Sequence, residues 1–79
     1  MPYVSQEVRK ELDKGSSPQT AGELTYLIYK LMISFLRGRK AYDHYNTVVG
    51  SVECAKMEFY RKEVAPYEDT KIKENGDVS

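Results

Sequence analysis

The sequence predicts an all-α protein: a short N-terminal helix followed by a long two-helix hairpin, whose last helix is kinked or restarted at Pro66. Three observations predict this class. Apolar residues recur at three- and four-residue spacings, no segment alternates as a strand does, and helix-ending residues separate the segments. With 79 residues, the chain forms a single helical domain. We expect helices at about 5–14, 21–37 and 44–74, then a tail at 75–79.

The first predicted helix, 5–14, is short. Every fourth residue from Val4 to Leu12 is apolar, and Ser5 is a suitable N-terminal cap. The run Gly15-Ser16-Ser17-Pro18 ends the pattern. We expect this helix to dock on another element because its apolar face is small.

The second predicted helix, 21–37, has the clearest beginning. Thr20 and Glu23 have the spacing of a capping box, in which hydroxyl and carboxylate each accept a hydrogen bond from an exposed backbone N–H. An apolar stripe follows as far as Gly38, which suits the left-handed position after a helix. The stripe consists of Leu24, Leu27, Ile28, Leu31, Met32, Phe35 and Leu36.

The third predicted helix, 44–74, is long and interrupted. Asp43 or Asn46 would cap its beginning. Pro66 lacks an N–H donor and clashes with the preceding turn, so the helix either kinks near Lys62 or restarts with proline in its first turn. A narrow seam suited to packing on another helix consists of Val48, Val52, Ala55 and Phe59. Val49, Tyr60, Val64 and Tyr67 fall beside that seam.

The short chain predicts a thin core. Domains of this size usually gain extra stability from disulfides, a metal or self-association. The single cysteine, Cys54, forms no internal disulfide, and with His44 alone it makes no zinc-ligand set. We therefore expect a homo-oligomer without metal or cofactor. Gly50, costly inside a helix, would permit the close approach of another helix.

The balance of charge and hydropathy argues against two classes of partner. The chain has 12 basic and 12 acidic residues, so it lacks the long-range field that attracts proteins to nucleic acid. No segment approaches the ~20 apolar residues of a membrane span. The N-terminus lacks the basic-then-apolar pattern of a secretory signal. We expect an intracellular protein without a nucleic-acid or membrane partner.

The acidic residues of the third helix predict no catalytic or metal site. Glu53 and Glu58 are five residues apart, about 140° around a helix, so their carboxylates do not converge on one ion. Ion pairs along the helix, such as Glu53–Lys56 and Glu58–Lys62, explain these residues better. We expect no catalytic residues and no enzymatic activity.

A basic connection joins the second and third helices. It contains Arg37, Arg39 and Lys40 and is followed by Tyr42. Guanidinium groups grip phosphates, and a tyrosine ring stacks on a nucleobase, so these four residues are a candidate phosphate or nucleotide site. The alternative is that cations here only offset the negative end of the second helix.

The chain has seven tyrosines, two phenylalanines and no tryptophan, so tyrosines supply most of its aromatic side chains. Tyrosine suits both the edge of a core and a protein interface. Tyr60 and Tyr67, together with Arg61, lie near the predicted kink. They are the candidate contact surface for a partner protein, and a place at the edge of the core is the alternative for each tyrosine.

Several short runs resemble the signature of a family of small bacteriophage proteins of unknown function. These runs are Gly22-Glu23-Leu24-Thr25-Tyr26, Val52-Glu53-Cys54-Ala55-Lys56, Glu58-Phe59-Tyr60-Arg61, Pro66-Tyr67-Glu68-Asp69 and Glu74-Asn75-Gly76-Asp77-Val78. The resemblance covers most of the chain from Gly22 onward. It implies a viral accessory protein in the host cytoplasm and names no reaction.

Two hypotheses about function follow. The preferred one is a non-enzymatic phage accessory protein, a small helical homo-oligomer that binds and blocks a host protein such as a defence component. The alternative is a nucleotide-binding module that sequesters a phosphate-bearing signalling molecule at Arg37, Arg39 and Lys40.

Overall fold

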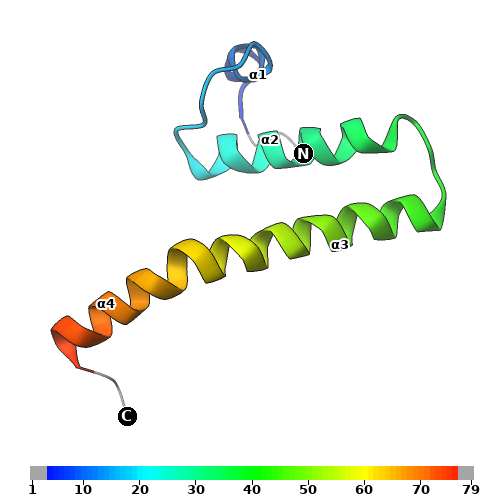
Figure 1. Cartoon of the computed structure of the whole chain (residues 1–79). Coiled ribbons are helices and arrows are strands. Elements are labelled where there is room, and N and C mark those ends of the chain that lie inside the picture. The colour runs from blue at the N-terminus through cyan, green and yellow to red at the C-terminus, as the bar shows by residue number, and fades with distance from the viewer. Residues whose placement is uncertain (1–3, 77–79) are drawn as a thin grey trace. The chain divides into compact units, whose positions relative to one another are not determined.

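The computed structural model describes residues 4–76, which are all-α as the sequence predicts. The elements are α1 (Gln6–Asp13), α2 (Ala21–Leu36), α3 (Tyr42–Phe59), a π-helical turn (Tyr60–Val64) and α4 (Ala65–Asn75). The last three are continuous, so this part of the chain contains three helices, the last of 34 residues (Figure 1). Of the predicted tail, residues 77–79 lie outside the described residues.

The chain divides into two compact units, Met1–His44 (unit 1) and Tyr45–Ser79 (unit 2). Each unit is described by itself. The packing of the second helix on the third, which the apolar stripes predict, stays a prediction.

In unit 1, α1 docks on α2. The Ser5 hydroxyl accepts a hydrogen bond from the Val8 N–H at 3.3 Å, which confirms the predicted cap. Leu12 is buried, and the Tyr26 hydroxyl donates to the Asp13 carboxylate at 2.9 Å. Burial raises the pKa of Tyr26, and the bond to Asp13 raises it further. The two helices contact each other and cross steeply, since α1 is seen nearly end-on where α2 runs lengthwise (Figure 1).

The beginning of α2 differs from a capping box by one residue. The Thr20 hydroxyl accepts from the Glu23 N–H at 3.1 Å, as predicted. The Glu23 carboxylate accepts from the Gln19 N–H at 2.9 Å, one residue before the position that the motif requires. The carboxylate therefore holds the connection as well as the first turn of the helix.

The end of α2 also differs by one residue. Gly38 has a positive φ of 77°, as predicted, but the left-handed turn begins at Arg37 with a φ of 52°. Arg37 is the only non-glycine residue with a positive φ among residues 4–76. This conformation costs a residue with a Cβ about 1 kcal/mol. The Arg39 N–H then donates to the Leu36 carbonyl at 2.8 Å.

The third helix begins earlier than predicted, at Tyr42. The predicted caps are therefore wrong, because Asp43 lies in the first turn and Asn46 lies inside the helix. The His44 N–H donates to the Ala41 carbonyl at 3.0 Å, which forms the first turn from the backbone. Asp43 still complements the positive end of the helix dipole from this position.

The π-helical turn accommodates Pro66. In a regular α-helix its ring would clash with the carbonyl of Lys62, four residues back. Here the Ala65 N–H donates to the Tyr60 carbonyl, five residues back, which is the π-helical pattern. Pro66 then lies in the first turn of α4. The structure thus combines the two predicted outcomes, a turn that deviates around Lys62 and a proline in the first turn of the next segment.

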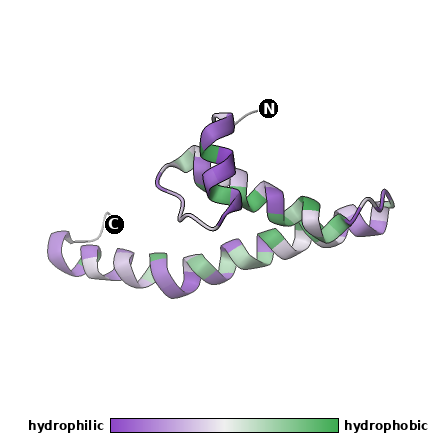
Figure 2. Cartoon of the chain, turned by 90° about the horizontal axis from the view of Figure 1, so that it is seen from above, coloured by the Kyte–Doolittle hydropathy of each residue, from purple (hydrophilic) through white to green (hydrophobic). Residues whose placement is uncertain are grey.

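Few side chains in the described part of the chain are buried. They are Leu12, Tyr26 and Val48. Along the predicted seam, Val48 is buried and Val52 is half-buried, but Ala55 and Phe59 are exposed. Apolar and polar residues alternate along α3, whereas α4 is mainly polar (Figure 2). The thin core that the chain length predicts is confirmed for residues 4–76.

Candidate functional site

Arg39, one of the residues of the predicted phosphate site, donates hydrogen bonds to the end of α2. Its Nε donates to the Leu36 carbonyl at 2.8 Å, and its Nη2 donates to the Phe35 carbonyl. The guanidinium carbon lies 5.1 Å from the centre of the Phe35 ring. These contacts satisfy carbonyls that a helix end leaves unpaired. Arg39 therefore acts as a side-chain cap for α2.

The other three residues of this connection project from the surface. Arg37 and Lys40 are exposed, and Tyr42 is 78% exposed. A tyrosine ring this exposed has one face available for stacking but lacks enclosing walls. Nucleotide binding here stays a prediction, and it would depend on Arg37 and Lys40, since the Arg39 guanidinium already has backbone partners.

Tyr60, in the predicted contact surface, is tied to its own helix. Its hydroxyl donates to the Glu68 carboxylate, which joins the π-helical turn to α4. This hydrogen bond raises the pKa of Tyr60, and the negative charge of Glu68 raises it further. Tyr60 remains half exposed, so its ring still offers surface to a partner.

Arg61 belongs to a small ion-pair cluster. Its Nη2 and the Lys62 Nζ each lie 2.8 Å from the Glu58 Oε1. The bond from Lys62, followed by that from Arg61, lowers the pKa of the Glu58 carboxyl. The predicted Glu58–Lys62 pair is confirmed. The Glu53–Lys56 pair is also confirmed, with a distance of 3.3 Å.

Tyr67 is the more exposed of the two tyrosines in the predicted contact surface. Its side chain is 61% exposed. The Lys71 ammonium lies 5.6 Å from the centre of its ring, close enough for a cation–π interaction. The structure therefore brings Tyr60, Arg61 and Tyr67 onto one short stretch of helix, but each has a different intrachain partner.

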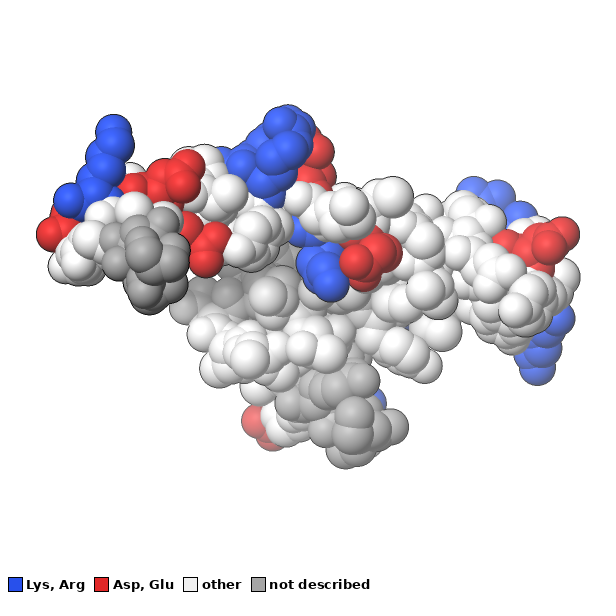
Figure 3. Space-filling model, turned by 90° about the horizontal axis from the view of Figure 1, so that it is seen from below, with Lys and Arg blue, Asp and Glu red and all other residues white. Residues whose placement is uncertain are grey.

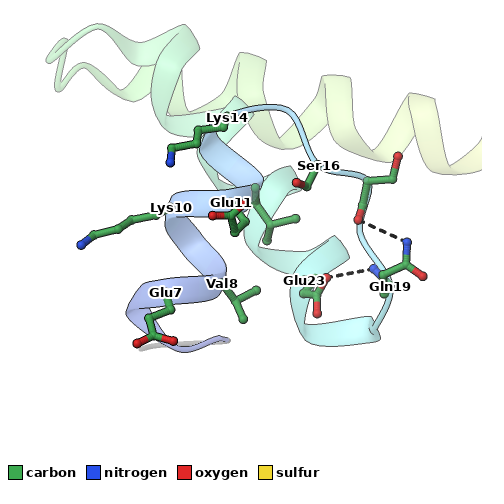
Figure 4. A pocket seen from close by; sticks show the side chains of 10 residues that line it. Glu7, Val8, Lys10, Glu11, Lys14, Ser16, Gln19 and Glu23 are labelled. Atoms are coloured by element: carbon green, nitrogen blue, oxygen red, sulfur yellow. Dashed lines mark hydrogen bonds between the residues drawn. The ribbon is translucent and has the colours of Figure 1, made fainter.

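Sequence reasoning missed a shallow hollow in unit 1, beside α1 and the connection to α2. Its volume is about 540 Å³. Gln19 lies at its edge (Figure 4). The Gln19 backbone N–H donates to the Glu23 carboxylate, and the Gln19 side chain donates to the Ser17 carbonyl. The lining consists of Glu7, Val8, Lys10, Glu11, Leu12, Lys14, Ser16, Ser17, Gln19 and Glu23. This hollow depends on how α1 docks, which no local sequence pattern specifies.

The hollow offers no recognisable reaction chemistry. Its charged residues are of both signs, and its remaining polar groups are hydroxyls and an amide. Among residues 4–76, no three His, Cys, Asp or Glu side chains come together as metal ligands would. On the face shown in Figure 3, basic and acidic residues are interspersed, without a large region of one sign.

The fold and these residues define an all-α protein whose candidate contacts lie on helix surfaces. The family model of a domain of unknown function, DUF6899, matches residues 1–78, and the chain belongs to this family. No curated protein and no solved structure matches the chain significantly. Within residues 4–76, no helix is long and apolar enough to cross a membrane.

Proposed function

We propose that this chain is a non-enzymatic accessory protein of a bacteriophage, a small helical homo-oligomer that binds and blocks a host protein in the host cytoplasm. The observation that carries the proposal is the exposure of large apolar side chains. Fourteen such residues are exposed among those described, against three that are buried. Single exposed apolar residues are ordinary, but this number on so short a chain is typical of a protein that works in contact with others.

The exposed residues occur in both units. Leu31 is 71% exposed and Phe59 is 62% exposed. The others are Leu24, Ile28, Tyr29, Ile33, Phe35, Tyr42, Tyr45, Val49, Met57, Tyr60, Tyr67 and Ile72. Aromatic residues and methionine are enriched at protein interfaces. Seven of the exposed residues are aromatic: Tyr29, Phe35, Tyr42, Tyr45, Phe59, Tyr60 and Tyr67.

The host partner follows from the resemblance to small phage proteins. Accessory proteins of this size have room for a contact surface but little room for an enclosed active site. Tyr60, Arg61 and Tyr67 supply rings and a guanidinium of the kind that dominates binding energy at interfaces. Defence components are the class of host protein to test first.

A capture experiment with matched variants tests this proposal. The wild-type chain, Tyr67→Ala and Met57→Ala are used as baits in host lysate, and any host polypeptide retained in fixed ratio is purified. Calorimetry with that polypeptide should give similar affinity for wild type and Met57→Ala, and about tenfold weaker binding for Tyr67→Ala. Equal affinity for all three baits would exclude Tyr67, and the absence of any stoichiometric polypeptide would count against host-protein binding.

A further inference from the structure

Residues 60–66 of unit 2 form a joint that has two ways to accommodate its proline. Pro66 lacks a backbone N–H, and in a straight α-helix its ring clashes with the carbonyl four residues back. A kink in an otherwise regular helix relieves that clash. The structure has the other arrangement, a π-helical turn, in which the Ala65 N–H donates to the Tyr60 carbonyl, five residues back. A regular helix would use the Arg61 carbonyl instead.

The backbone pairs about equally well in the two registers. In the regular register, the Lys62 carbonyl has no donor, because Pro66 would have to supply it. In the observed register, the Arg61 carbonyl loses its regular donor, since the Ala65 N–H is bonded elsewhere. The residue five positions after Arg61 is again Pro66. Each register therefore withdraws the ladder donor from one carbonyl, and another interaction has to select between them.

A side-chain hydrogen bond distinguishes the two registers. The Tyr60 hydroxyl donates to the Glu68 carboxylate, eight residues further on. Residues eight apart lie about 80° apart around a regular α-helix, whereas the extra residue of a π-helical turn reduces this angle to about 20°. The hydrogen bond thus suits the observed register and is misaligned in the regular one. Because its acceptor is a carboxylate, it is also stronger than a bond between neutral groups.

The basic side chains of the joint are held towards α3. Arg61 and Lys62 both pair with Glu58, each at 2.8 Å. The spacings of these pairs, three and four residues, are those of a regular helix. The ion pairs therefore do not require the extra residue of the π-helical turn, whereas the bond between Tyr60 and Glu68 does.

A change of register would rotate α4 relative to α3. Each residue of an α-helix corresponds to about 100° of rotation. Returning the extra residue to a regular ladder therefore turns every side chain after the joint by about 100° around the helix axis. Tyr67 and Ile72 are exposed apolar side chains that would move to another side. The register of the joint thus determines which residues of α3 and α4 share a face.

We infer that the hydrogen bond between Tyr60 and Glu68 is a latch that holds the joint in the π-helical register, and that opening it returns the helix to the regular register with a kink at Pro66. Any group that binds the Glu68 carboxylate competes with the tyrosine and so opens the latch. Contact at this residue is thereby coupled to the faces that α4 presents. The inference concerns unit 2 alone and does not rest on the proposed function.

Nuclear magnetic resonance of the full chain tests the latch, because scalar coupling across a hydrogen bond identifies the carbonyl that accepts from the Ala65 N–H. In the wild type, this coupling should join Ala65 to Tyr60. Tyr60→Phe keeps the ring and removes the hydroxyl. The coupling to residue 60 should weaken and one to Arg61 should appear, since loss of such a bond shifts the ratio of the registers about three- to tenfold.

Matched variants separate the latch from a general effect of substitution. Tyr67→Phe also removes a tyrosine hydroxyl from this stretch of helix and should leave the coupling as in the wild type. Glu68→Ala should act as Tyr60→Phe does, whereas Glu68→Gln, which keeps an acceptor oxygen, should retain the wild-type coupling. A wild-type coupling in both Tyr60→Phe and Glu68→Ala would overturn the inference. An equal change in Tyr67→Phe, or a wild type in which Ala65 couples to Arg61, would also overturn it.

Discussion

Unit 1 and unit 2 are stabilised by different kinds of contact. In unit 1, two helices separated by a loop meet through Leu12 and the hydrogen bond between Tyr26 and Asp13. In unit 2, the recorded ion pairs join residues three or four apart, and Tyr60–Glu68 spans the π-helical turn of the same helix. Unit 1 has tertiary structure of its own, whereas unit 2, taken by itself, is one helical segment.

This difference bears on the source of stability. An isolated helix is marginal in water, and most helical stability in proteins comes from packing an apolar face. A single helix cannot bury its own face, so unit 2 depends on packing against another element, either the apolar stripe of α2, as the sequence predicts, or a second chain. The comparison therefore predicts that variants in the core of unit 1 act on folding, and the proposed homo-oligomer predicts that variants on the exposed apolar residues of unit 2 act on association.

Leu12→Ala should have the largest effect on unit 1. It removes a buried side chain from the contact between α1 and α2 and should lower the free energy of unfolding by about 2–3 kcal/mol. Chemical denaturation measures this change. Leu31→Ala, which truncates a leucine that is mostly exposed, is the control and should have a much smaller effect. Comparable losses for both variants would contradict the assignment of Leu12 to the core of unit 1.

Gly50→Ala should stabilise unit 2 by about 1 kcal/mol, because glycine inside a helix is unfavourable and an added Cβ would meet no atom within 4 Å. Within the described part of unit 2, no neighbouring atom gives a packing reason for this glycine. Thermal unfolding should show a higher midpoint with self-association unchanged. Loss of self-association would instead place the subunit contact on the Gly50 face of this helix.

Arg37→Gly should stabilise the end of α2 by about 1 kcal/mol, since glycine adopts the left-handed conformation at little cost. The same variant tests the nucleotide-binding hypothesis. Calorimetry with mono- and cyclic nucleotides should show heat that disappears in Arg37→Gly if this connection binds phosphate. Binding that survives both Arg37→Gly and Lys40→Ala would exclude the site.

The smallest expected effects are those of pH on unit 2. The pKa of Glu58 is lowered in the folded chain, so its contribution to stability is present above the usual carboxyl range and is lost as pH falls through the folded-state value. The pKa of Tyr60 is raised, so its contribution is present below about pH 10 and is lost above it. Glu58→Gln should reduce the loss of helical content as the pH falls, and Tyr60→Phe should reduce the loss of helical content as the pH rises above about 10. Profiles identical to that of the wild type would show that neither interaction persists in solution.

Sequence patterns predicted the parts of this fold that depend on neighbouring residues. The fold class, the caps at Ser5 and Thr20 and the ion pairs three or four apart all follow from local spacing. The earlier start of α3 was missed because its first turn includes a backbone hydrogen bond from His44 to Ala41, which no residue type signals in the sequence. The left-handed Arg37 was missed because glycine is the usual residue for that conformation.

The candidate contact surface was predicted only in part. Tyr60, Arg61 and Tyr67 were found from residue type and spacing, and whether they bind a partner stays a prediction. The hydrogen bond between Tyr60 and Glu68 was missed, because residues eight apart do not face each other in a regular helix and the extra residue of the π-helical turn aligns them. Likewise, no local pattern assigns Arg39 to the carbonyls of Phe35 and Leu36.

Hydrogen exchange measured by mass spectrometry over a dilution series tests the central claim most directly, because it reports on both units in one sample. Amides of residues 52–72 should lose protection as the chain is diluted, while amides of α2 near Tyr26 keep theirs until global unfolding. Protection of residues 52–72 that does not change on dilution, in a chain that sediments as a monomer, would contradict the claim that self-association stabilises unit 2.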